Sequence, residues 1–552
     1  MKSKWILVAI LVLAAVLRLY RLADFPVGLN ADEAALGYNA YSLLLTGKDE
    51  HGHPWPVNLE SFGDFKPALY AYILIPFIKI FGLTELAVRL PSAIFGILAV
   101  YFIYLLVKEL STEHCALISA AMLAISPWAI HFSRGGWEVN VATTMLLIGT
   151  WSFIKWLKNP KFLWLGICIL GFVLSMYAYQ SARVIAPLFG LGLFILYFKQ
   201  LLKYPKQIFW AFLTLTLILT PLAISIFRSN AASRLSGVGL LADVGPLNRA
   251  QELRGQHANW NSSLSRLFHN RPVLYTIAFL KNYSDHFFGN FLFVNGDIIE
   301  RNRVPETGLL YLTDFIFLAL GAVYLLRTKD QRLETKLVWL WLLVAPVASA
   351  MTFQTPHALR AHSMVIPLVI ILSFGIYSFF IDFSQSATKS ILKIKNLKLL
   401  WLVVGSFMIV YVWQVARYLH EYYIHYPQTY PAAWEYGFKE LVPYIESVKD
   451  RYEKILITDK YDQPYILFLF YSQYPPERFQ GNHQLTVRDK FNFSTVRDYD
   501  KFHFSDTPWS KVSDIHSSLI VAAPEDIPDV GVNIVKTINF PSGRPAFKIV
   551  SN

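Results

Sequence analysis

"GLNADEAALGYNAYSLLLTGKDEHG", residues 28–52, follows directly on the first apolar segment of the chain. Asp32 and Glu33 stand side by side in it, and small and aromatic residues follow them at helical spacing. The pattern predicts a helix whose first turn carries two carboxylates. Such a pair can cap the helix and favour its dipole. It also suits acid–base chemistry beside an apolar segment, and at this point both explanations stay open.

The composition is that of a membrane protein. Of the 552 residues, 54% are hydrophobic and only 16% charged, whereas soluble domains are about a quarter charged. The net charge of +12 does not indicate nucleic-acid binding, because the lysines and arginines fall in short clusters between apolar runs. About eleven runs are long enough to cross a bilayer: 5–20, 87–107, 115–132, 139–157, 162–180, 184–198, 207–227, 309–326, 337–353, 364–382 and 397–416. The segment 67–82 is shorter, holds two prolines, and predicts a helix lying at the membrane surface.

The basic residues predict the orientation. They cluster in every second loop, at 2–4, 108, 155–161, 199–206, 327–336 and 389–398, as expected for cytoplasmic loops. The N-terminus resembles a signal peptide but lacks a small-x-small cleavage site, which predicts an uncleaved first helix. We therefore expect a multi-pass protein of the plasma (inner) membrane with a cytoplasmic N-terminus. Its outer face would carry loops at about 21–86 and 228–308 and the C-terminal tail.

The tail predicts a separate domain. Apolar runs near residue 455, in "SSLIVAAPEDIPDV" and in "INFPSGRPAFKIV" are typical of strands bounded by proline and glycine turns, and residues 430–452 of an amphipathic helix. We predict a transmembrane domain at 1–418 and an extracytoplasmic α/β domain at 419–552. Cys115 and Cys168 lie in or beside apolar runs, which argues against a disulfide framework.

Charged side chains gather at the predicted outer ends of the spans. Lys66 precedes an apolar helix, an unusual position for a cation unless an anion binds there, although a lysine can also snorkel at the interface. Arg134 and Glu138 flank a helix break and suit either a pocket or a surface pair. At the same level lie His131, Arg183 and Arg360.

Carboxylates and cations at one depth are typical of a site for an anionic lipid headgroup with acid–base chemistry. His51 and His53 give a weak metal hint that a solvated loop explains more simply. We find no nucleotide-binding glycine loop and no serine nucleophile elbow.

The motifs "ADEAALGYNAYSLLLTG", "DFKPALYAYI" and "ELAVRLPSAIFGILAVYFIYLLVKEL" resemble the GT-C superfamily of membrane glycosyltransferases. The resemblance is strongest to the bacterial branch related to protein O-mannosyltransferases and lipid A aminoarabinose transferases (glycosyltransferase families 39 and 83). It covers roughly residues 1–420 by topology, with specific motifs mainly in 28–140. It implies a GT-C helix bundle with interfacial helices on its outer face. It also implies transfer of a sugar from a polyprenyl phosphate to an acceptor, with inversion at the anomeric carbon.

The resemblance assigns the general base to Asp32, with Glu33 as its neighbour, and a second acidic position to Glu138. Ala68 stands where relatives commonly have a second proline. Phe65 occupies a position that helps bind zinc in some aminoarabinose transferases, so zinc is not carried over. We expect no required cofactor, and a divalent metal is not indicated. A carboxylate must take the acceptor's proton and cations must balance the lipid phosphate, roles that fit Lys66, Arg183 and Arg360.

The leading hypothesis is thus an inverting hexosyl- or pentosyltransferase that uses a polyprenyl-phosphate sugar on the outer face. Its sugar and acceptor pocket would be formed by Tyr38, His131, Arg134 and Glu138. Its partners would be the lipid-linked donor, membrane lipid and an acceptor protein, glycolipid or cell-wall glycan, without nucleic acid. The alternatives are a transporter or flippase of lipid-linked saccharides and a non-catalytic envelope assembly scaffold. Neither the donor sugar nor the acceptor follows from the sequence.

Overall fold

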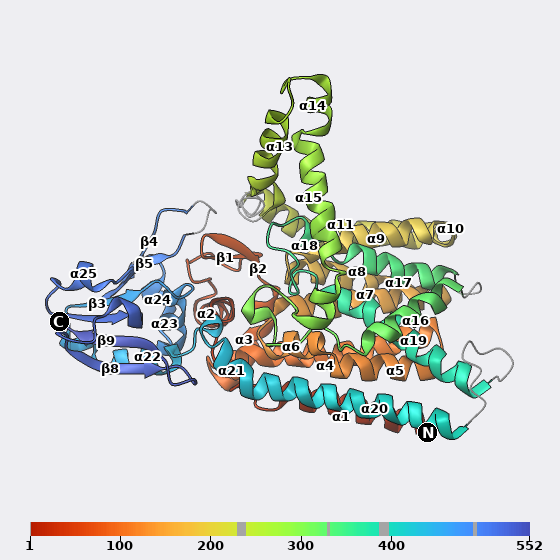
Figure 1. The fold of residues 1–552 in the computed structure, drawn as a ribbon, viewed down its shortest axis with the longest axis horizontal. Helices are drawn as coiled ribbons and strands as arrows, with labels where there is room; N and C mark the ends of the chain where they lie inside the picture. Colours follow the sequence, from red (N-terminus) through yellow and green to blue (C-terminus); the bar gives the residue numbers. More distant parts are fainter. Residues whose placement is uncertain (1, 229–238, 328–331, 386–396, 490–493) are drawn as a thin grey trace.

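The computed structural model describes residues 2–228, 239–327, 332–385, 397–489 and 494–552. A helical bundle and a sheet-containing C-terminal part lie end to end, with the N-terminus at the end of the bundle away from the sheet (Figure 1). The basic positions Lys329, Lys389, Lys393 and Lys395, used above for orientation, lie outside the described residues.

Each predicted span coincides with a helix or a pair of helices. In chain order these are α1 (Lys2–Leu19), α4 (Glu85–Leu110), α5 (Glu113–Ile125) with α6 (Pro127–Arg134), α7 (Glu138–Lys158), α8 (Phe162–Ala178), α9 (Ala182–Leu196), α11 (Pro205–Arg228), α16 (Asp314–Arg327), α17 (Arg332–Val344) with α18 (Val347–Ala350), α19 (Val365–Gln385) and α20 (Leu397–His420), with the short α10 (Phe198–Leu201) after α9. Within the described ranges, three helices are long and apolar enough to cross a membrane, or four if α5 and α6 form one bent span. The helices are therefore confirmed, whereas the number of eleven spans stays a prediction.

One predicted span is broken. The run 115–132 divides at Ser126, where α5 and α6 meet at 54°. Ser126 caps α6 by accepting a hydrogen bond from the Ala129 amide, and Pro127 occupies the first turn, where its missing N–H is tolerated. The bend carries His131 and Arg134 into the protein interior, where both side chains are buried.

Two glycines allow a close helix crossing. A Cβ on Gly375 of α19 would lie 1.8 Å from the Phe317 carbonyl oxygen of α16, and one on Gly321 would lie 1.9 Å from the Ile371 carbonyl oxygen. The two backbones therefore touch at this point, as small residues permit in apolar helix pairs.

The first predicted outer loop contains α2 (Ala31–Thr46), a hairpin of β1 (Asn58–Ser61) and β2 (Asp64–Pro67), and α3 (Leu69–Phe81). The predicted interfacial helix is confirmed as a helix, although Pro67 ends a strand rather than starting α3. The second loop contains η2 (Leu240–Ala242), α13 (Gly245–Gly255), α14 (Ser263–Phe268), α15 (Arg271–Asp285), η3 (Asn290–Val294) and η4 (Glu300–Asn302), and η5 (His362–Met364) precedes α19.

The C-terminal part is built on a seven-stranded sheet, ordered β4-β5-β6-β3-β7-β9-β8. Its central strand β3 pairs in parallel with β6 and β7, and the remaining pairs are antiparallel. The strands are β3 (Lys454–Thr458), β4 (His483–Leu485), β5 (Val496–Tyr499), β6 (Phe502–Ser505), β7 (Ser518–Ala522), β8 (Ile534–Asn539) and β9 (Pro545–Ser551). The strands expected near 455, 518 and 545 are therefore present.

Helical elements connect and cover this sheet. They are η6 (Glu421–His425), α21 (Tyr426–Thr429), η7 (Ala432–Trp434), α22 (Phe438–Val448), η8 (Lys449–Arg451), α23 (Pro464–Ser472), α24 (Pro476–Phe479), α25 (Trp509–Val512) and η9 (Pro524–Asp526). Side chains alternate along β3: Ile455 and Ile457 enter the core that includes α22 and α23, and Leu456 enters a smaller core with Ile520.

Helix α2 shares its core with the sheet part. Its apolar residues belong to one buried cluster with α3, α22, α23 and the sheet, separate from the main core of the bundle. Gly37 marks this junction, because a Cβ there would meet the Phe470 ring of α23 at 2.7 Å and Val88 of α4 at 2.8 Å. The helix that carries Asp32 is therefore packed between the bundle and the C-terminal part.

Candidate active site

Asp32 lies in the first turn of α2, and its side chain is 32% exposed. Asn30 caps the helix. Lys66 of β2 donates a hydrogen bond to Asp32 Oδ1, and its ammonium group also lies 4.2 Å from the centroid of the Phe62 ring. The first-loop carboxylate and the lysine singled out in the sequence are therefore in direct contact.

The β1–β2 hairpin holds Lys66 in this position. Phe62 and Gly63 form its two-residue turn, both with positive φ (59° and 72°), as in the tight turns that match the twist of a hairpin. Across the hairpin, Leu59 pairs with Lys66 and Asn58 with Pro67. The turn thus sets the strand register that places Lys66 beside α2.

Two further charged residues, Arg301 and Asp462, lie beside Asp32 and Lys66. The sequence did not single them out. Arg301 of η4 lies 3.9 Å from Asp32 Oδ2 and 3.6 Å from Asp462 Oδ2, and Asp462 comes from the loop between β3 and α23. Burial opposes the charge of Arg301, but Asp32 and Asp462 outweigh it and raise its pKa. The arginine is thus a fixed cation between the first loop and the C-terminal part.

Burial also alters the acids around Arg301. The Asp462 side chain is 53% exposed, and partial desolvation raises its pKa, an effect that Arg301 partly opposes and Asp32 adds to. Glu435, just after η7, has a pKa well above its usual range because it is buried and lies near Asp462. Its Oε2 has no hydrogen-bond partner among the described residues.

Glu33 has different surroundings from its neighbour. It is completely buried and forms a capping box with Asn30. Its Oε1 accepts hydrogen bonds from Arg89 Nε at 3.1 Å and from the Gly136 amide at 2.6 Å. Arg89 is also completely buried, and it donates to the carbonyl oxygens of Leu22, Pro26 and Gly28. Through Arg89, Glu33 therefore joins α2 to α4 and to residues 22–28, which precede α2.

The residues predicted for the sugar and acceptor pocket lie in several places. Arg134 is buried and donates to backbone carbonyls at the end of α1, including those of Leu17 and Tyr20. His131 Nε2 donates to the Arg301 carbonyl oxygen at 2.8 Å, which supports the segment that carries this arginine. Tyr38 donates to the Tyr474 carbonyl oxygen within the shared core. Glu138 is buried at the start of α7.

The two remaining arginines, Arg183 and Arg360, donate hydrogen bonds to different parts of the chain. Arg183, at the start of α9, donates a hydrogen bond to Asn58 of β1, on the hairpin that carries Lys66. Arg360 donates to Thr352 Oγ1 at 2.7 Å. Its loop is tied to the Arg301 segment through Asp297, which accepts hydrogen bonds from the Ala358 amide and from Asn302.

The histidines of the first loop contact other parts of the chain. His51 Nδ1 lies 3.1 Å from His483 Nε2 of β4, and His53 Nδ1 lies 3.1 Å from Asp49 Oδ2. Over the described ranges of the chain, no group of three or more His, Cys, Asp or Glu side chains is arranged to hold a metal ion.

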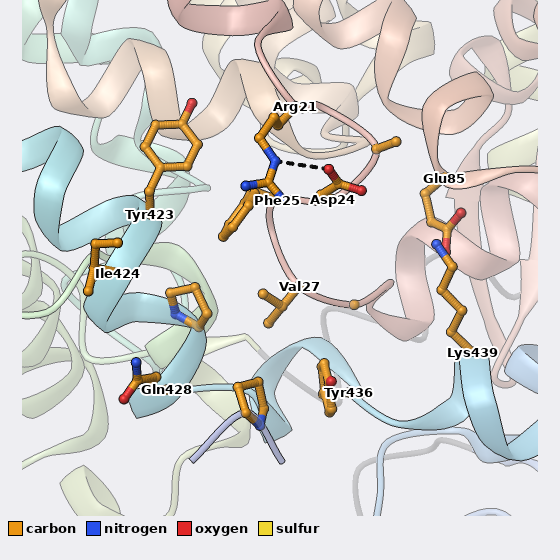
Figure 2. A pocket seen from close by; sticks show the side chains of 14 residues that line it. Arg21, Asp24, Phe25, Val27, Glu85, Tyr423, Ile424, Gln428, Tyr436 and Lys439 are labelled. Carbon is orange, nitrogen blue, oxygen red and sulfur yellow. Dashed lines mark hydrogen bonds and ion pairs between the residues drawn. The ribbon is translucent and has the colours of Figure 1, made fainter. Parts of the chain in front are cut away.

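A pocket of about 410 Å³ opens beside the segment that precedes α2, residues 21–28 (Figure 2). Figure 2 shows Tyr423 on the left, the Arg21–Asp24 ion pair at the top, Glu85 and Lys439 on the right, and Tyr436 below. None of the residues predicted for the site lines it. Gly28 does, and its carbonyl is held by Arg89, so the pocket wall is attached to the Glu33–Arg89 pair.

The fold has relatives among solved structures. ArnT from Cupriavidus metallidurans aligns with a TM-score of 0.56 and 11% identity, over 100% of this chain and 98% of that one. The archaeal oligosaccharyltransferase AglB from Archaeoglobus fulgidus aligns with a TM-score of 0.52 and 12% identity, over 86% of this chain and 64% of the other. The chain therefore shares its fold with ArnT and AglB.

The sequence matches are more local. Residues 65–224 match the family model described as dolichyl-phosphate-mannose-protein mannosyltransferase. YycA and YkcB of Bacillus subtilis (strain 168), provisionally named mannosyltransferases, are 27% identical over 171 residues and 31% identical over 86 residues. These alignments cover 31% and 16% of this chain and only 25% and 12% of the relatives. Together with the fold, the matches confirm the resemblance to GT-C glycosyltransferases inferred from the motifs.

Proposed function

We propose that the protein is an inverting glycosyltransferase that moves a sugar from a polyprenyl phosphate to an acceptor hydroxyl. The observation that carries this proposal is a partly exposed carboxylate, Asp32, contacted by Lys66 and faced by Arg301. This arrangement supplies a proton acceptor and two cations within one group. The GT-C fold and the mannosyltransferase family match support sugar transfer as the reaction class.

The chemistry divides between the carboxylate and the cations. The acceptor oxygen attacks the anomeric carbon, its proton passes to Asp32, and the bond from the anomeric carbon to the phosphate oxygen breaks. The lipid phosphate leaves with the electron pair, and attack from the opposite face inverts the anomeric carbon. A base within hydrogen-bond reach and fixed cations near the leaving group are the two requirements of this step.

Lys66 would have two successive partners. Without donor it contacts the Asp32 carboxylate. A donor phosphate competes for the same ammonium group, and the transfer of Lys66 to the phosphate would expose Asp32 Oδ1 to the acceptor hydroxyl. Arg301, Arg183 on the β1–β2 hairpin side, and Arg360 would add positive charge. The bound dolichol-phosphate named for AglB supports a lipid-phosphate ligand for this fold.

The acid–base role is assigned to Asp32 alone, because Glu33 is buried and its carboxylate is already bonded to Arg89 and Gly136. His131 would act by positioning Arg301. The reaction would take place on the outer face of the plasma membrane, the side predicted for the first loop and for the C-terminal domain from about residue 419. A polyprenyl-phosphate mannose is the first donor to test, because the family model and both Bacillus relatives carry mannosyltransferase names.

The test uses the purified full chain in nanodiscs with a panel of polyprenyl-phosphate hexoses and pentoses and candidate acceptors. Mass spectrometry follows release of the lipid phosphate, and NMR of the product gives the anomeric configuration. We expect Asp32→Asn to lower transfer by about 10²–10⁴-fold while Asp450→Asn, at a 91% exposed carboxylate in the C-terminal part, retains it. Full activity of Asp32→Asn, retention of configuration, or movement of donor without its consumption would each contradict the proposal.

A further inference from the structure

Helices α13, α14 and α15 form an arm, residues 245–285, that projects from the side of the molecule. In Figure 1 it rises across the direction of the long bundle helices, from the end of the bundle nearest the sheet. Its base is fastened where α17 and α18 end: Tyr283 donates to the Leu343 carbonyl oxygen, and Asn282 to the Thr352 carbonyl oxygen. The arm therefore leaves the protein where apolar helices end.

The arm exposes large apolar side chains. Leu264, Leu267 and Phe268 follow the i, i+3, i+4 spacing that places them on one face of α14. The exposed set, each more than half accessible, comprises Trp260, Leu264, Leu267, Phe268, Ile277 and Leu280. Within the described structure, the bundle and the sheet do not cover these side chains, and a monomeric soluble surface rarely shows so many together.

Cations accompany this apolar surface. Residues 245–285 hold five basic and two acidic side chains, which gives a net charge of +3. Arg254 lies over the Trp260 ring at 5.5 Å, and Arg266 donates to Asn261, so that the arginines border the exposed apolar residues at the tip. Arg271 starts α15 beside the same turn. Aromatic and aliphatic side chains bordered by arginines match the depth profile of a bilayer surface, with acyl chains below and anionic phosphates above.

We propose that this arm docks on the anionic lipid surface around the bundle, with the apolar side chains of α14 inserted among the acyl chains. Arg254, Arg266 and Arg271 would lie at the level of the lipid phosphates. The arm runs across the direction of the bundle helices and leaves the bundle where apolar helices end. An interfacial helix requires this orientation. Docking of the arm does not depend on the identity of the donor or on Asp32, so an arm that fails to dock would leave the proposed function untouched.

Spin labelling tests the docking directly. Both native cysteines, Cys115 and Cys168, are buried, so a nitroxide can be attached selectively at Leu267→Cys. The matched control is Val530→Cys, which replaces an 86% exposed side chain of the C-terminal part. Both proteins are placed in nanodiscs of phosphatidylglycerol and phosphatidylethanolamine, and EPR compares collisions of the label with oxygen and with a water-soluble nickel chelate.

We expect oxygen collisions to dominate at position 267 and nickel collisions at position 530. Replacing Arg254, Arg266 and Arg271 by Gln should weaken docking by about fivefold per charge, as should nanodiscs of phosphatidylcholine alone. A label at 267 that behaves like the one at 530 overturns lipid docking, and shielding that occurs only in native membranes assigns the arm to a protein partner instead. Immersion unchanged by loss of the three arginines overturns the electrostatic part.

Discussion

Replacing Glu33 by Gln separates the two adjacent carboxylates of α2. The substitution keeps the size of the side chain and removes its charge. Arg89 then remains as a completely buried cation opposite a neutral amide. Because Asp32 is partly exposed and Glu33 fully buried, we expect Glu33→Gln to act on stability and Asp32→Asn on transfer.

The magnitude follows from the contacts of Glu33. Removing one partner of a buried ion pair costs about 3–5 kcal/mol. The amide oxygen of Gln can still accept the hydrogen bond from Gly136, while Arg89 keeps its bonds to three backbone carbonyls. We therefore expect the lower end of that range, about 3 kcal/mol, which lowers the thermal unfolding midpoint by several degrees.

Tryptophan fluorescence during heating measures the midpoint, since the chain contains 15 tryptophans. Transfer is assayed well below that temperature, where the folded fraction of both variants is high. The double variant Glu33→Gln/Arg89→Met completes a cycle that isolates the coupling between the two side chains. If Glu33→Gln unfolds at the wild-type temperature and yet loses transfer, the structural role of Glu33 is refuted and the carboxylate belongs to the chemistry.

Three further outcomes are expected. Arg301→Gln should lower kcat/KM for the lipid donor by about tenfold to a thousandfold, whereas Arg497→Gln, at an exposed arginine, should not; equal kinetics of the two variants would contradict a donor role. Burial raises the pKa of Glu435 in the folded protein. Between the unfolded and the folded pKa, the folded protein therefore keeps a proton on this side chain that the unfolded chain has lost. Stability falls as pH rises through this interval. Glu435→Gln should therefore raise the unfolding midpoint at pH 8 more than at pH 4.5, and a gain independent of pH would refute this sign. Gly375→Leu should lower the free energy of unfolding by about 1–3 kcal/mol, because the side chain would separate α16 from α19. The same melting assay measures this change, and a midpoint equal to that of the wild type would show that the close crossing does not stabilise the fold.

The sequence was most informative where a local pattern decides the structure. Apolar runs predicted the helices, and the strands at 455, 518 and 545 followed from short β-branched segments between turns. The hairpin at 58–67 was less visible, since its register depends on a few residues within a longer mixed segment. The number of spans was not decided, because length and hydropathy do not distinguish a short buried helix from a crossing one.

For the candidate site, sequence motifs pointed to Asp32 and Lys66, which are 34 residues apart in the same loop. Arg301 and Asp462 were missed because they lie far along the chain, and only the tertiary fold brings them to Asp32. Cationic positions in "DIIERNRVP", residues 297–305, were the available signal. Arg134 illustrates the opposite case: its type and depth suggested a ligand, whereas its hydrogen bonds go to backbone carbonyls at the end of α1.

The common core of α2 and the sheet defines which parts of this protein can be exchanged. A chimera that grafts a new C-terminal part at residue 419 would leave α2 with an uncovered apolar face and Arg301 without Asp462. A viable graft must carry the first loop and the C-terminal part together, because Gly37 and Tyr38 are fitted to Phe470 and Tyr474 across that seam. The unit of this architecture that can be exchanged is therefore a pair of segments distant in sequence, and engineering should recombine them as one block.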